Sequence, residues 1–268
     1  MKKRIGICQL DVVNNWRTNL DKAEQMVRKV VSEGAEYVIL PEMFICPFVT
    51  SLFRKCAESD LGETKRRMSQ LAKELSVVII AGSIPEIDGD KVVNISYCFD
   101  REGNVISEHR KIHLFEATLK DGTKIREADA VNAGSTPTAF ELDGETYGMA
   151  ICFDLRFSEL FSAMAKSNPK IIFVPAAFNM TTGPAHWEIT NRMRALDQQC
   201  FVITCAPAHN DTSLYVSYGH SMVCDPYGQV VCDLGPDETA KVVEIDLGDI
   251  EKYRDLLPII KNRRPDVY

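Results

Sequence analysis

Three reactive side chains of different types each follow directly on, or lie at the end of, a segment that is predicted to be a strand. Glu42 follows YVILP, Lys111 follows VISEHR, and Cys152 follows TYGMAI. A thiol, a carboxylate and a fixed cation form a chemical set, because they can act as nucleophile, general base and oxyanion stabiliser in acyl transfer. The chain contains nine cysteines, and a free cysteine is usually a small buried hydrophobe. The neighbours of each residue must therefore decide between a chemical and a structural role.

The residues around Cys152 indicate how its thiol would be activated. The apolar run ends at Cys152, the polar turn FDLR follows, and a helical pattern begins after that turn. A sulfur at a strand-to-helix turn lies near backbone N–H groups and a helix N-terminus, and this setting stabilises a thiolate. The arrangement is similar to a nucleophile elbow without its flanking glycines. We therefore expect Cys152 to be the nucleophile and its thiolate to be stabilised.

Glu42 and Lys111 each have a structural and a functional interpretation. Most acidic residues are solvated loop carboxylates, but Glu42 lies in LPEMFICPF, between apolar residues and two prolines. Desolvation there would raise its pKa towards the range of a general base. A lysine at a strand end is usually a surface charge, but Ile112, Leu114 and Phe115 indicate that the loop after Lys111 is partly buried.

A cysteine–histidine pair is the rival arrangement for the same chemistry. The spacing of the five histidines along the chain does not select any one of them as a partner for Cys152. Both arrangements therefore stay open at the level of the residues. The histidines are His109, His113, His186, His209 and His220.

The elements that must position these side chains are short apolar runs alternating with helical patterns. The turns REGN and Asp143-Gly144 each join two apolar runs and predict hairpins, and residues 225–229 predict a third. Strands are expected at 4–11, 37–44, 77–83, 94–100, 105–111, 139–142, 145–151, 171–178, 201–208 and 241–247. Helices are expected at 14–34, 63–75, 156–168 and 185–200.

Alternating strands and helices with added hairpins predict an α/β fold in which two sheets pack face to face and helices cover the outer faces. In the helix at 185–200, Ile189, Met193 and Leu196 are expected to face inward. A doubly wound single sheet is the alternative, but no GxGxxG follows the first strand, so a dinucleotide site has no support. The expected inner face of the first helix is Leu20, Ala23, Val27, Val30 and Val31.

Composition bounds the class of protein. A chain of 268 residues predicts one large domain over residues 1–268. The net charge of -7 and the pI near 5.4 give little electrostatic support for nucleic-acid binding, so a small substrate is expected. No segment reaches the ~20 apolar residues of a membrane span, and the N-terminal apolar run is too short for a signal peptide. The odd, scattered cysteines show no CxxC pair, which favours a reducing cytoplasm over a disulfide framework or a zinc site.

The three candidate residues lie in segments that are typical of a known family. These segments are LPEMF around Glu42, HRKIHLF around Lys111 and ICFDLRF around Cys152, in that order. Over nearly its whole length the chain resembles the nitrilase-like carbon-nitrogen hydrolases. The stretches 175–188 and 215–230 look most like the omega-amidase branch of that family. Members of this branch cleave the side amide of 2-oxo dicarboxylic monoamides such as 2-oxoglutaramate and 2-oxosuccinamate.

The resemblance implies a single-domain, four-layer α-β-β-α sandwich that forms a homodimer or a higher homo-oligomer. It also implies an amidase that forms a thioester on Cys152 and needs neither a metal nor an organic cofactor. Glu127 falls where the family has a second glutamate, whose implied role is to hold the lysine and the substrate. This assignment of Glu127 rests on the resemblance alone.

The proposed substrate makes further demands on the chain. The backbone N–H of Phe153 would join Lys111 in stabilising the oxyanion, and a distal carboxylate would require a cation or several hydrogen-bond donors. Arg156 is either that cation or a structural residue paired with Asp154 or Glu159. The candidates for binding the carboxylate are Arg156, Asn179, Thr181 and Thr182.

Two departures from the omega-amidase pattern concern the substrate. This chain has Cys46-Pro47-Phe48 where omega-amidases typically read SPY, and its loop 116–127 is more charged than the loop usual there. Both segments are expected to border the pocket. The open alternatives are the same chemistry on deaminated glutathione, an N-carbamoyl amine or an aliphatic amide, and a catalytically silent binding subunit. Nucleotide binding is a weaker option because the phosphate-cradling glycines are missing.

Overall fold

The computed structural model describes residues 1–118, 122 and 124–267, and a six-stranded mixed sheet forms from the first part of the chain and one late strand. Its strand order is β14-β1-β2-β3-β4-β5. The strands β1, β2 and β3 run parallel, whereas β4, β5 and β14 join as antiparallel neighbours. The bounds are β1 (Lys2–Gln9), β2 (Tyr37–Ile39), β3 (Val78–Asp88), β4 (Lys91–Phe99), β5 (Val105–Arg110) and β14 (Thr239–Asp246).

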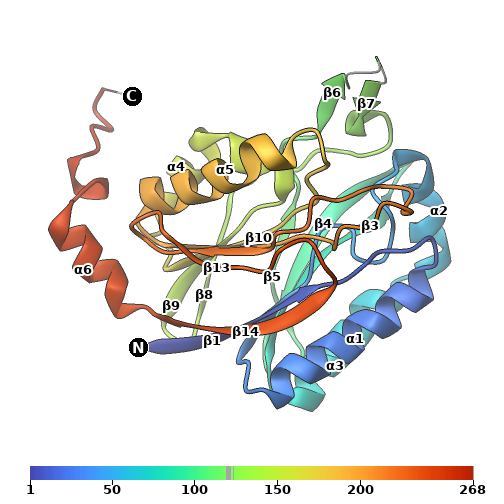
Figure 1. Ribbon diagram of the computed structural model, residues 1–268, viewed down its shortest axis with the longest axis horizontal. Helices are drawn as coiled ribbons and strands as arrows, with labels where there is room; N and C mark the ends of the chain where they lie inside the picture. Colours follow the sequence, from blue (N-terminus) through green and yellow to red (C-terminus); the bar gives the residue numbers. More distant parts are fainter. Residues whose placement is uncertain (119–121, 123, 268) are drawn as a thin grey trace.

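A second six-stranded sheet has the order β13-β12-β11-β10-β9-β8. Its three central strands β9, β10 and β11 are parallel, and antiparallel partners complete both sides. The bounds are β8 (Thr138–Leu142), β9 (Glu145–Met149), β10 (Ile171–Pro175), β11 (Phe201–Cys205), β12 (Met222–Cys224) and β13 (Val230–Asp233). A separate two-stranded ribbon consists of β6 (Glu116–Thr118) and β7 (Lys124–Arg126) and projects from the body in Figure 1.

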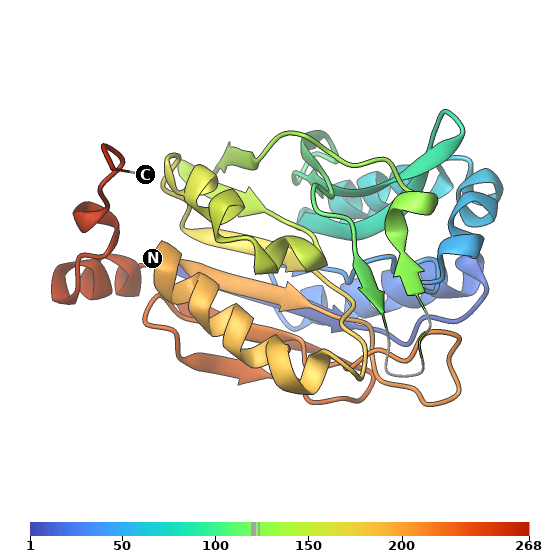
Figure 2. The same ribbon diagram turned by 90° about the horizontal axis from the view of Figure 1, so that it is seen from above.

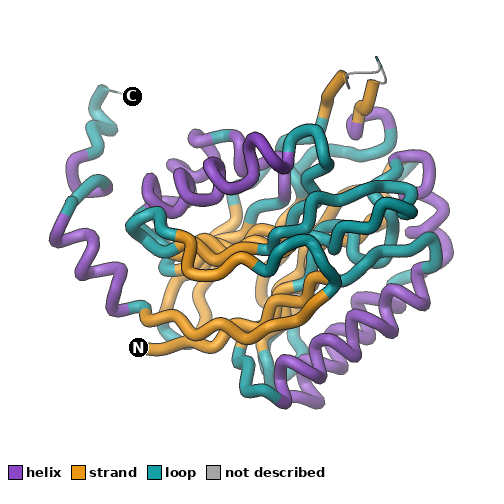
Figure 3. The backbone as a smooth tube through the Cα atoms, viewed as in Figure 1, coloured by secondary structure: helices purple, strands orange, loops and turns teal. Residues whose placement is uncertain are grey.

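Helices cover the outer faces of both sheets, as Figures 1 and 3 show. On one side α1 and α3 pack against the first sheet, and on the other α4 and α5 lie over the second. Figure 2 shows that α6 and the residues after it extend away from the sandwich. The four-layer α-β-β-α architecture expected from the sequence is therefore confirmed. The bounds are α1 (Trp16–Ser32), α2 (Thr50–Asp60), α3 (Glu63–Leu75), α4 (Ser158–Ala165), α5 (Gly183–Gln198) and α6 (Gly248–Leu256).

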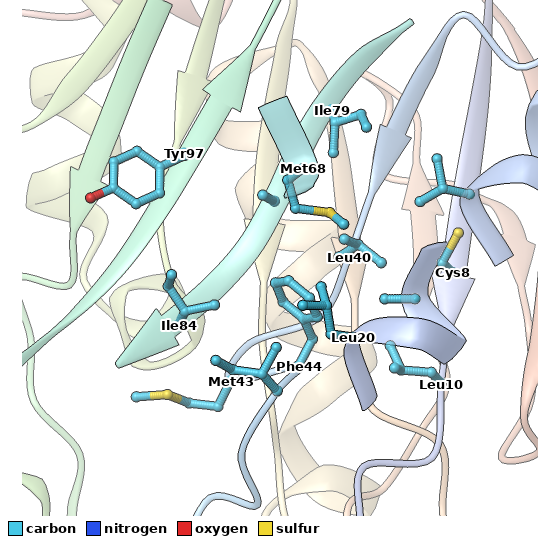
Figure 4. Close-up of a cluster of buried hydrophobic side chains, with 14 of the residues drawn as sticks. Cys8, Leu10, Leu20, Leu40, Met43, Phe44, Met68, Ile79, Ile84 and Tyr97 are labelled. Carbon is cyan, nitrogen blue, oxygen red and sulfur yellow. The ribbon is translucent and has the colours of Figure 1, made fainter. Parts of the chain in front are cut away.

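The central core lies between the two sheets and is built by strands whose alternate side chains face each other. Ile5 and Ile39 of the first sheet and Phe173 and Ile203 of the second belong to one buried cluster. An outer cluster fills the space between the first sheet and its helices, where Leu20 contributes from α1 (Figure 4). Each fully buried side chain of this size contributes about 1.5–3 kcal/mol to folding. The rigid sandwich thus fixes the strand ends that carry the candidate residues.

The inner face predicted for α1 is largely confirmed. Leu20, Ala23, Val27 and Val30 are buried, while Val31 lies at the margin of the cluster. The side chain of Asn15 caps this helix by accepting a hydrogen bond from the N–H of Thr18 at 3.2 Å. The sequence analysis missed α2, which is short. No helix among the described residues is long and apolar enough to cross a bilayer.

The inner face predicted for α5 is wrong. Ile189 is 66% exposed and Met193 is 46% exposed, because the helix turns a different face to the second sheet. That inner face contains buried polar side chains that form hydrogen bonds, so apolar periodicity does not reveal it. The Trp187 indole donates to the carbonyl of His220 at 2.6 Å, and Arg194 Nε donates to the carbonyl of Leu155 at 3.0 Å.

Candidate active site

Glu42, Lys111 and Glu127 form one buried cluster of charges. All three side chains are 0% exposed, and Lys111 Nζ lies 2.8 Å from Glu42 Oε1 and 2.8 Å from Glu127 Oε2. Glu42 lies three residues after Ile39, the last residue of β2, and Lys111 directly follows β5. The structure therefore brings together two residues predicted from the strand ends and the glutamate implied by the family resemblance.

Asn94 completes this cluster, and the sequence analysis missed it. Its Nδ2 donates to Glu42 Oε1 at 2.9 Å and to Glu127 Oε1 at 3.1 Å. The backbone N–H of Lys111 also donates to the carbonyl of Asn94 at 2.9 Å. Glu42 Oε2, in contrast, is buried and has no hydrogen-bond partner among the described residues. One carboxylate oxygen of Glu42 is thus held in place while the other stays free to accept a proton.

The segment that carries Glu42 is held by a close backbone contact. Gly82 of β3 packs so tightly that a Cβ there would lie 2.0 Å from the carbonyl oxygen of Pro41. Met43, the residue directly after Glu42, adopts a left-handed conformation with φ of 51°. Its backbone N–H donates to Ser83 Oγ at 3.1 Å. The position of the Glu42 carboxylate is therefore set by neighbouring backbone.

Cys152 lies at the predicted strand-to-helix turn. It follows β9, begins the short 3₁₀ helix η2 (Cys152–Arg156), and has φ of 46°. A non-glycine residue in this left-handed region carries a cost of about 1–2 kcal/mol, which persists only when the surroundings enforce it. The backbone N–H of Ala177 points to the Cys152 sulfur at 3.4 Å.

The expectation of a stabilised thiolate is wrong for the resting protein. Burial raises the pKa of the Cys152 thiol well above its ordinary value, and the charge of Glu42 raises it further. Lys111 and the Ala177 N–H oppose this shift without cancelling it. The predicted thiolate followed from the local turn alone, because the sequence around Cys152 does not reveal a buried carboxylate from the other sheet. A protonated thiol beside a carboxylate requires that carboxylate as its base.

The pKa values of Glu42 and Lys111, the two residues that act with this thiol, are also shifted. Burial raises the pKa of Glu42, as expected from its apolar surroundings, although Lys111 acts in the opposite direction. Burial opposes the charge of Lys111, but Glu127 and Glu42 outweigh it and hold its pKa well above its ordinary value. Lys111 is thus a fixed cation, whereas Glu42 has the raised pKa of a proton acceptor.

A narrow pocket opens at Cys152. Phe48, at one of the two departures from the omega-amidase pattern, borders it as expected. Its ring lies 5.0 Å from Lys111 Nζ and 5.4 Å from the ring of Tyr215, a pocket residue that the sequence analysis did not single out. The residues that line the pocket are Phe48, Phe115, Cys152, Phe153, Arg156, Ala177, Phe178, Asn179, Thr182 and Tyr215.

Arg156 is a cation in this pocket. Its guanidinium lies 4.8 Å from the centre of the Phe178 ring, and Nη1 contacts His186 Nδ1 at 3.2 Å. Its Nε is buried without a hydrogen-bond partner among the described residues. Among the described residues no ion pair joins Arg156 to Asp154 or Glu159, so the pairing expected for a structural Arg156 does not form.

The remaining polar candidates divide between two cavities. Thr182 lines the pocket of Cys152, Thr181 is exposed and lines a neighbouring open cavity together with Lys124, and Asn179 lines both. The carbonyl of the Asn179 side chain accepts the N–H groups of Thr181 and Thr182 at 3.0 Å each. The described part of the loop 116–127 borders that second cavity, while residues 119–121 and 123 lie outside the described residues.

The histidines do not pair with Cys152. His109 and His113 instead contact Asp154, and His186 contacts Arg156 at the rim of the pocket. Among the described residues, no group of three or more His, Cys, Asp or Glu side chains converges as a possible metal ligand set. The arrangement that the structure presents is therefore a thiol, a carboxylate with a free oxygen and a fixed cation, positioned for acyl transfer.

Comparisons with known proteins agree with this geometry. The family model for carbon-nitrogen hydrolases matches residues 4–255. The crystal structure of Saccharomyces cerevisiae Nit3, a member of branch 10 of the nitrilase superfamily, has a TM-score of 0.89 and 33% identity over 98% of this chain and 97% of that one. The chain therefore belongs to the carbon-nitrogen hydrolase family.

More similar sequences narrow the class within this family. The omega-amidase NIT2 of Danio rerio is 39% identical over 267 residues, which cover 100% of this chain and 96% of that protein. The omega-amidase NIT2 of Homo sapiens is 36% identical over 265 residues, with 99% and 96% covered. The chain is thus an omega-amidase-like amidase of the nitrilase superfamily.

Proposed function

We propose that this amidase releases ammonia from the side amide of a small 2-oxo dicarboxylic monoamide, such as 2-oxoglutaramate or 2-oxosuccinamate. Cys152 is the nucleophile, Glu42 the general base, and Lys111 with the backbone N–H of Phe153 the oxyanion donors. The observation that carries the proposal is the free Oε2 of Glu42 in the same buried cluster as a protonated thiol and a fixed cation.

The reaction proceeds in two halves. Glu42 takes the proton of the Cys152 thiol while the sulfur attacks the amide carbonyl carbon, and Lys111 stabilises the resulting oxyanion. The C–N bond then breaks, the leaving nitrogen takes the proton from Glu42, and ammonia departs. A thioester remains on Cys152.

Water completes the second half. Glu42 takes a proton from water, the resulting hydroxide attacks the thioester carbonyl, and the C–S bond breaks. The proton on Glu42 returns to the sulfur as the acid leaves, so the enzyme is restored. Glu127 assists by holding Lys111 in place, since it supplies the second carboxylate of the ion-pair cluster.

Arg156 is the residue we propose for the distal carboxylate of the substrate. It is the guanidinium that lines the pocket, and its Nε lacks a partner among the described residues, so it has donor capacity to offer. Asn179 and Thr182 would add donors beside it. Thr181 faces the neighbouring cavity and is not proposed as a contact.

Replacing Arg156 tests the substrate class. A hydrogen bond to a charged group contributes about 1.5–3 kcal/mol, so Arg156→Met should raise KM for 2-oxoglutaramate by about 10- to 150-fold. Arg156→Lys, which keeps the charge, should lose less, and KM for a neutral aliphatic amide should change little in both variants. Equal losses on the acidic and the neutral amide would contradict a carboxylate-binding role.

Cys152→Ala tests the chemistry itself. Ammonia release should fall by at least about a thousandfold, because the covalent intermediate is lost. Mass spectrometry of the wild-type enzyme stopped during turnover should show an acyl group on Cys152, and its mass identifies the acid. Unchanged turnover in the variant would refute the mechanism, and an inactive wild type on every amide would indicate a binding subunit.

A panel of amides separates the remaining substrates. Deaminated glutathione, an N-carbamoyl amine and a simple aliphatic amide would use the same Cys152 chemistry but place different groups beside Arg156. The proposal requires the highest kcat/KM on a 2-oxo dicarboxylic monoamide. A higher value on any other member of the panel would reassign the substrate and leave the hydrolase class unchanged.

We also propose that the chain forms a homodimer through the exposed face of α5. Ile189, Met193 and Tyr227 line an open hollow of about 510 Å³ on this face, and Glu188 and Arg192 lie at its rim. Ile189→Lys should convert a dimer to monomers in analytical ultracentrifugation, while a matched change at the isolated exposed Leu61 should not. An unchanged oligomer in the first variant would exclude this face.

A further inference from the structure

Asp154 is a fully buried carboxylate whose four hydrogen-bonding positions are all occupied. Its Oδ2 accepts the N–H of Ile151 at 3.0 Å and contacts His109 Nε2 at 3.0 Å. Its Oδ1 accepts the N–H of His113 at 2.9 Å and contacts His113 Nδ1 at 2.7 Å. An ionised carboxylate only accepts, so both ring nitrogens act as donors here. Because all four acceptor positions of the Asp154 carboxylate are occupied, its side chain is suited to a specific structural role.

The partners of Asp154 come from both sheets. His109 lies in β5 of the first sheet and His113 lies two residues beyond Lys111, whereas Asp154 lies in η2, which begins three residues after the end of β9 in the second sheet. Lys111 therefore stands midway between the two histidines, and Cys152 stands two residues before the carboxylate. The Asp154 contacts join the half of the site that carries Lys111 to the half that carries the thiol.

Asp154 also closes the turn that presents the sulfur. Its backbone N–H donates to the carbonyl of Ile151 at 3.0 Å, and its Oδ2 accepts the N–H of Ile151 at the same distance. These two bonds bracket Cys152, whose φ of 46° must be enforced by its surroundings. The direction of the sulfur thus depends on the same carboxylate that holds the two histidines.

The histidines are themselves held firmly. His109 Nδ1 contacts Thr138 Oγ1 at 3.0 Å, and the His113 ring stacks on Phe157 with centroids 3.6 Å apart. Burial would raise the pKa of Asp154, but the hydrogen bonds from His109 and His113 outweigh it and hold that pKa below its ordinary value. The carboxylate therefore remains charged and keeps all its acceptor positions.

We propose that Asp154, acting through His109 and His113, is a positioning residue that sets the Cys152 sulfur relative to Glu42 and Lys111. The proposal rests on the function proposed above for Cys152. It assigns to Asp154 no contact with substrate. Its role is to hold two half-sites, one from each sheet, at the separation that proton transfer from the thiol requires.

Asp154→Asn is the direct test, because asparagine has nearly the same shape but replaces two acceptor positions with donors. A displacement of about 1 Å can cost a hundredfold in rate, so kcat should fall by about ten- to a hundredfold with KM within about threefold. The rate at which iodoacetamide alkylates Cys152 at neutral pH should also fall by about fivefold or more, because alkylation of this protonated thiol depends on Glu42.

Asp143→Asn is the matched control. Asp143 also joins the two sheets, through Tyr37 and Arg101, but lies at the opposite end of β9 from Cys152. The Asp143→Asn variant should have a lower melting temperature than the wild type but an unchanged kcat and an unchanged rate of Cys152 alkylation. His109→Gln, which keeps an N–H donor, should retain more of kcat than His109→Leu, which has none.

The outcomes separate this proposal from the one it rests on. If Asp154→Asn keeps kcat and the alkylation rate within about twofold, or loses only thermal stability as Asp143→Asn does, Asp154 is a structural residue and the proposal is overturned. If Cys152→Ala retains turnover, the assignment of the nucleophile fails, whatever Asp154→Asn does. Loss of turnover in Cys152→Ala together with loss of kcat in Asp154→Asn supports both.

Discussion

Lys111→Met removes a cation that two buried carboxylates share, and the loss of stability can be estimated from their geometry. Lys111 Nζ lies 2.8 Å from both Glu42 and Glu127, and none of the three side chains is exposed. Removing one partner of a buried ion pair destabilises a protein by about 3–5 kcal/mol. For a chain of this size about 2–4 °C of melting temperature corresponds to each kcal/mol, so Tm should fall by about 6–20 °C.

This loss of stability should depend on pH with a defined sign. In the wild type the pKa of Lys111 is raised, so its contribution is present below its unfolded pKa and is lost only as pH rises through the raised value. In Lys111→Met the carboxylates of the cluster are buried without their cation, which favours their protonated forms in the folded state. Above about pH 4.5 the folded state then binds more protons than the unfolded state, and stability falls as pH rises. The deficit in Tm should be larger at about pH 8 than at about pH 5.

The double variant Lys111→Met/Glu127→Gln separates stability from catalysis. Removing the second uncompensated charge should restore part of Tm at about pH 8, whereas kcat for ammonia release should stay at least about a hundredfold below wild type in both variants. Thermal unfolding at the two pH values and a coupled ammonia assay provide the measurements. A single variant as stable as wild type at pH 8, or a double variant less stable than the single, would refute this reasoning.

Three further results are expected. Burial raises the pKa of Glu42, so the acidic limb of kcat/KM should have its inflection above 4.5, and Glu42→Gln should cost at least about a hundredfold across the profile. Gly82→Ala should lower both Tm and kcat because its Cβ would press on Pro41. Gly89 has open space around it, so Gly89→Ala should lose only about 1 kcal/mol of stability, from the positive φ of 66°, and should leave kcat intact. Asn94→Ala should lower kcat about tenfold because Glu42 loses a hydrogen bond. Asn94→Asp should lower kcat further, because a third carboxylate would repel the other two. Equal kcat in the two variants would contradict the proposed orientation of Glu42.

The parts of the fold that depend on local sequence could be predicted. The hairpin at Asp143-Gly144 formed as expected, because the two residues adopt the positive φ values of 54° and 76° that this turn requires. The inner face of α1 followed from its apolar spacing. The inner face of α5 did not, because Asn191 and Arg194 are buried there with hydrogen-bond partners that lie on or beyond the helix. Apolar periodicity cannot detect a polar group that the fold satisfies.

The same limit applies to the site. Glu42, Lys111 and Cys152 could be singled out because each lies at the end of a predicted strand. Asn94 lies inside a strand, 52 residues from Glu42, and its sequence neighbours give no sign of the amide's two carboxylate partners. The raised pKa of the Cys152 thiol was likewise missed because it depends on burial in the folded protein and on the charge of Glu42, which comes from the other sheet. A contact of this kind becomes visible only when topology brings the two segments together.

The pairing of β1 with β14 has a consequence for folding during synthesis on the ribosome. Eight residue pairs, from Lys2 with Asp246 to Gln9 with Thr239, join segments that lie far apart along the chain, so the ribosome produces β1 long before β14. Until β14 emerges, β1 presents an unpaired edge that can pair with another nascent chain. Such late, non-local closure makes folding slow, so a chain stalled before residue 239 would be a substrate for chaperones or for aggregation.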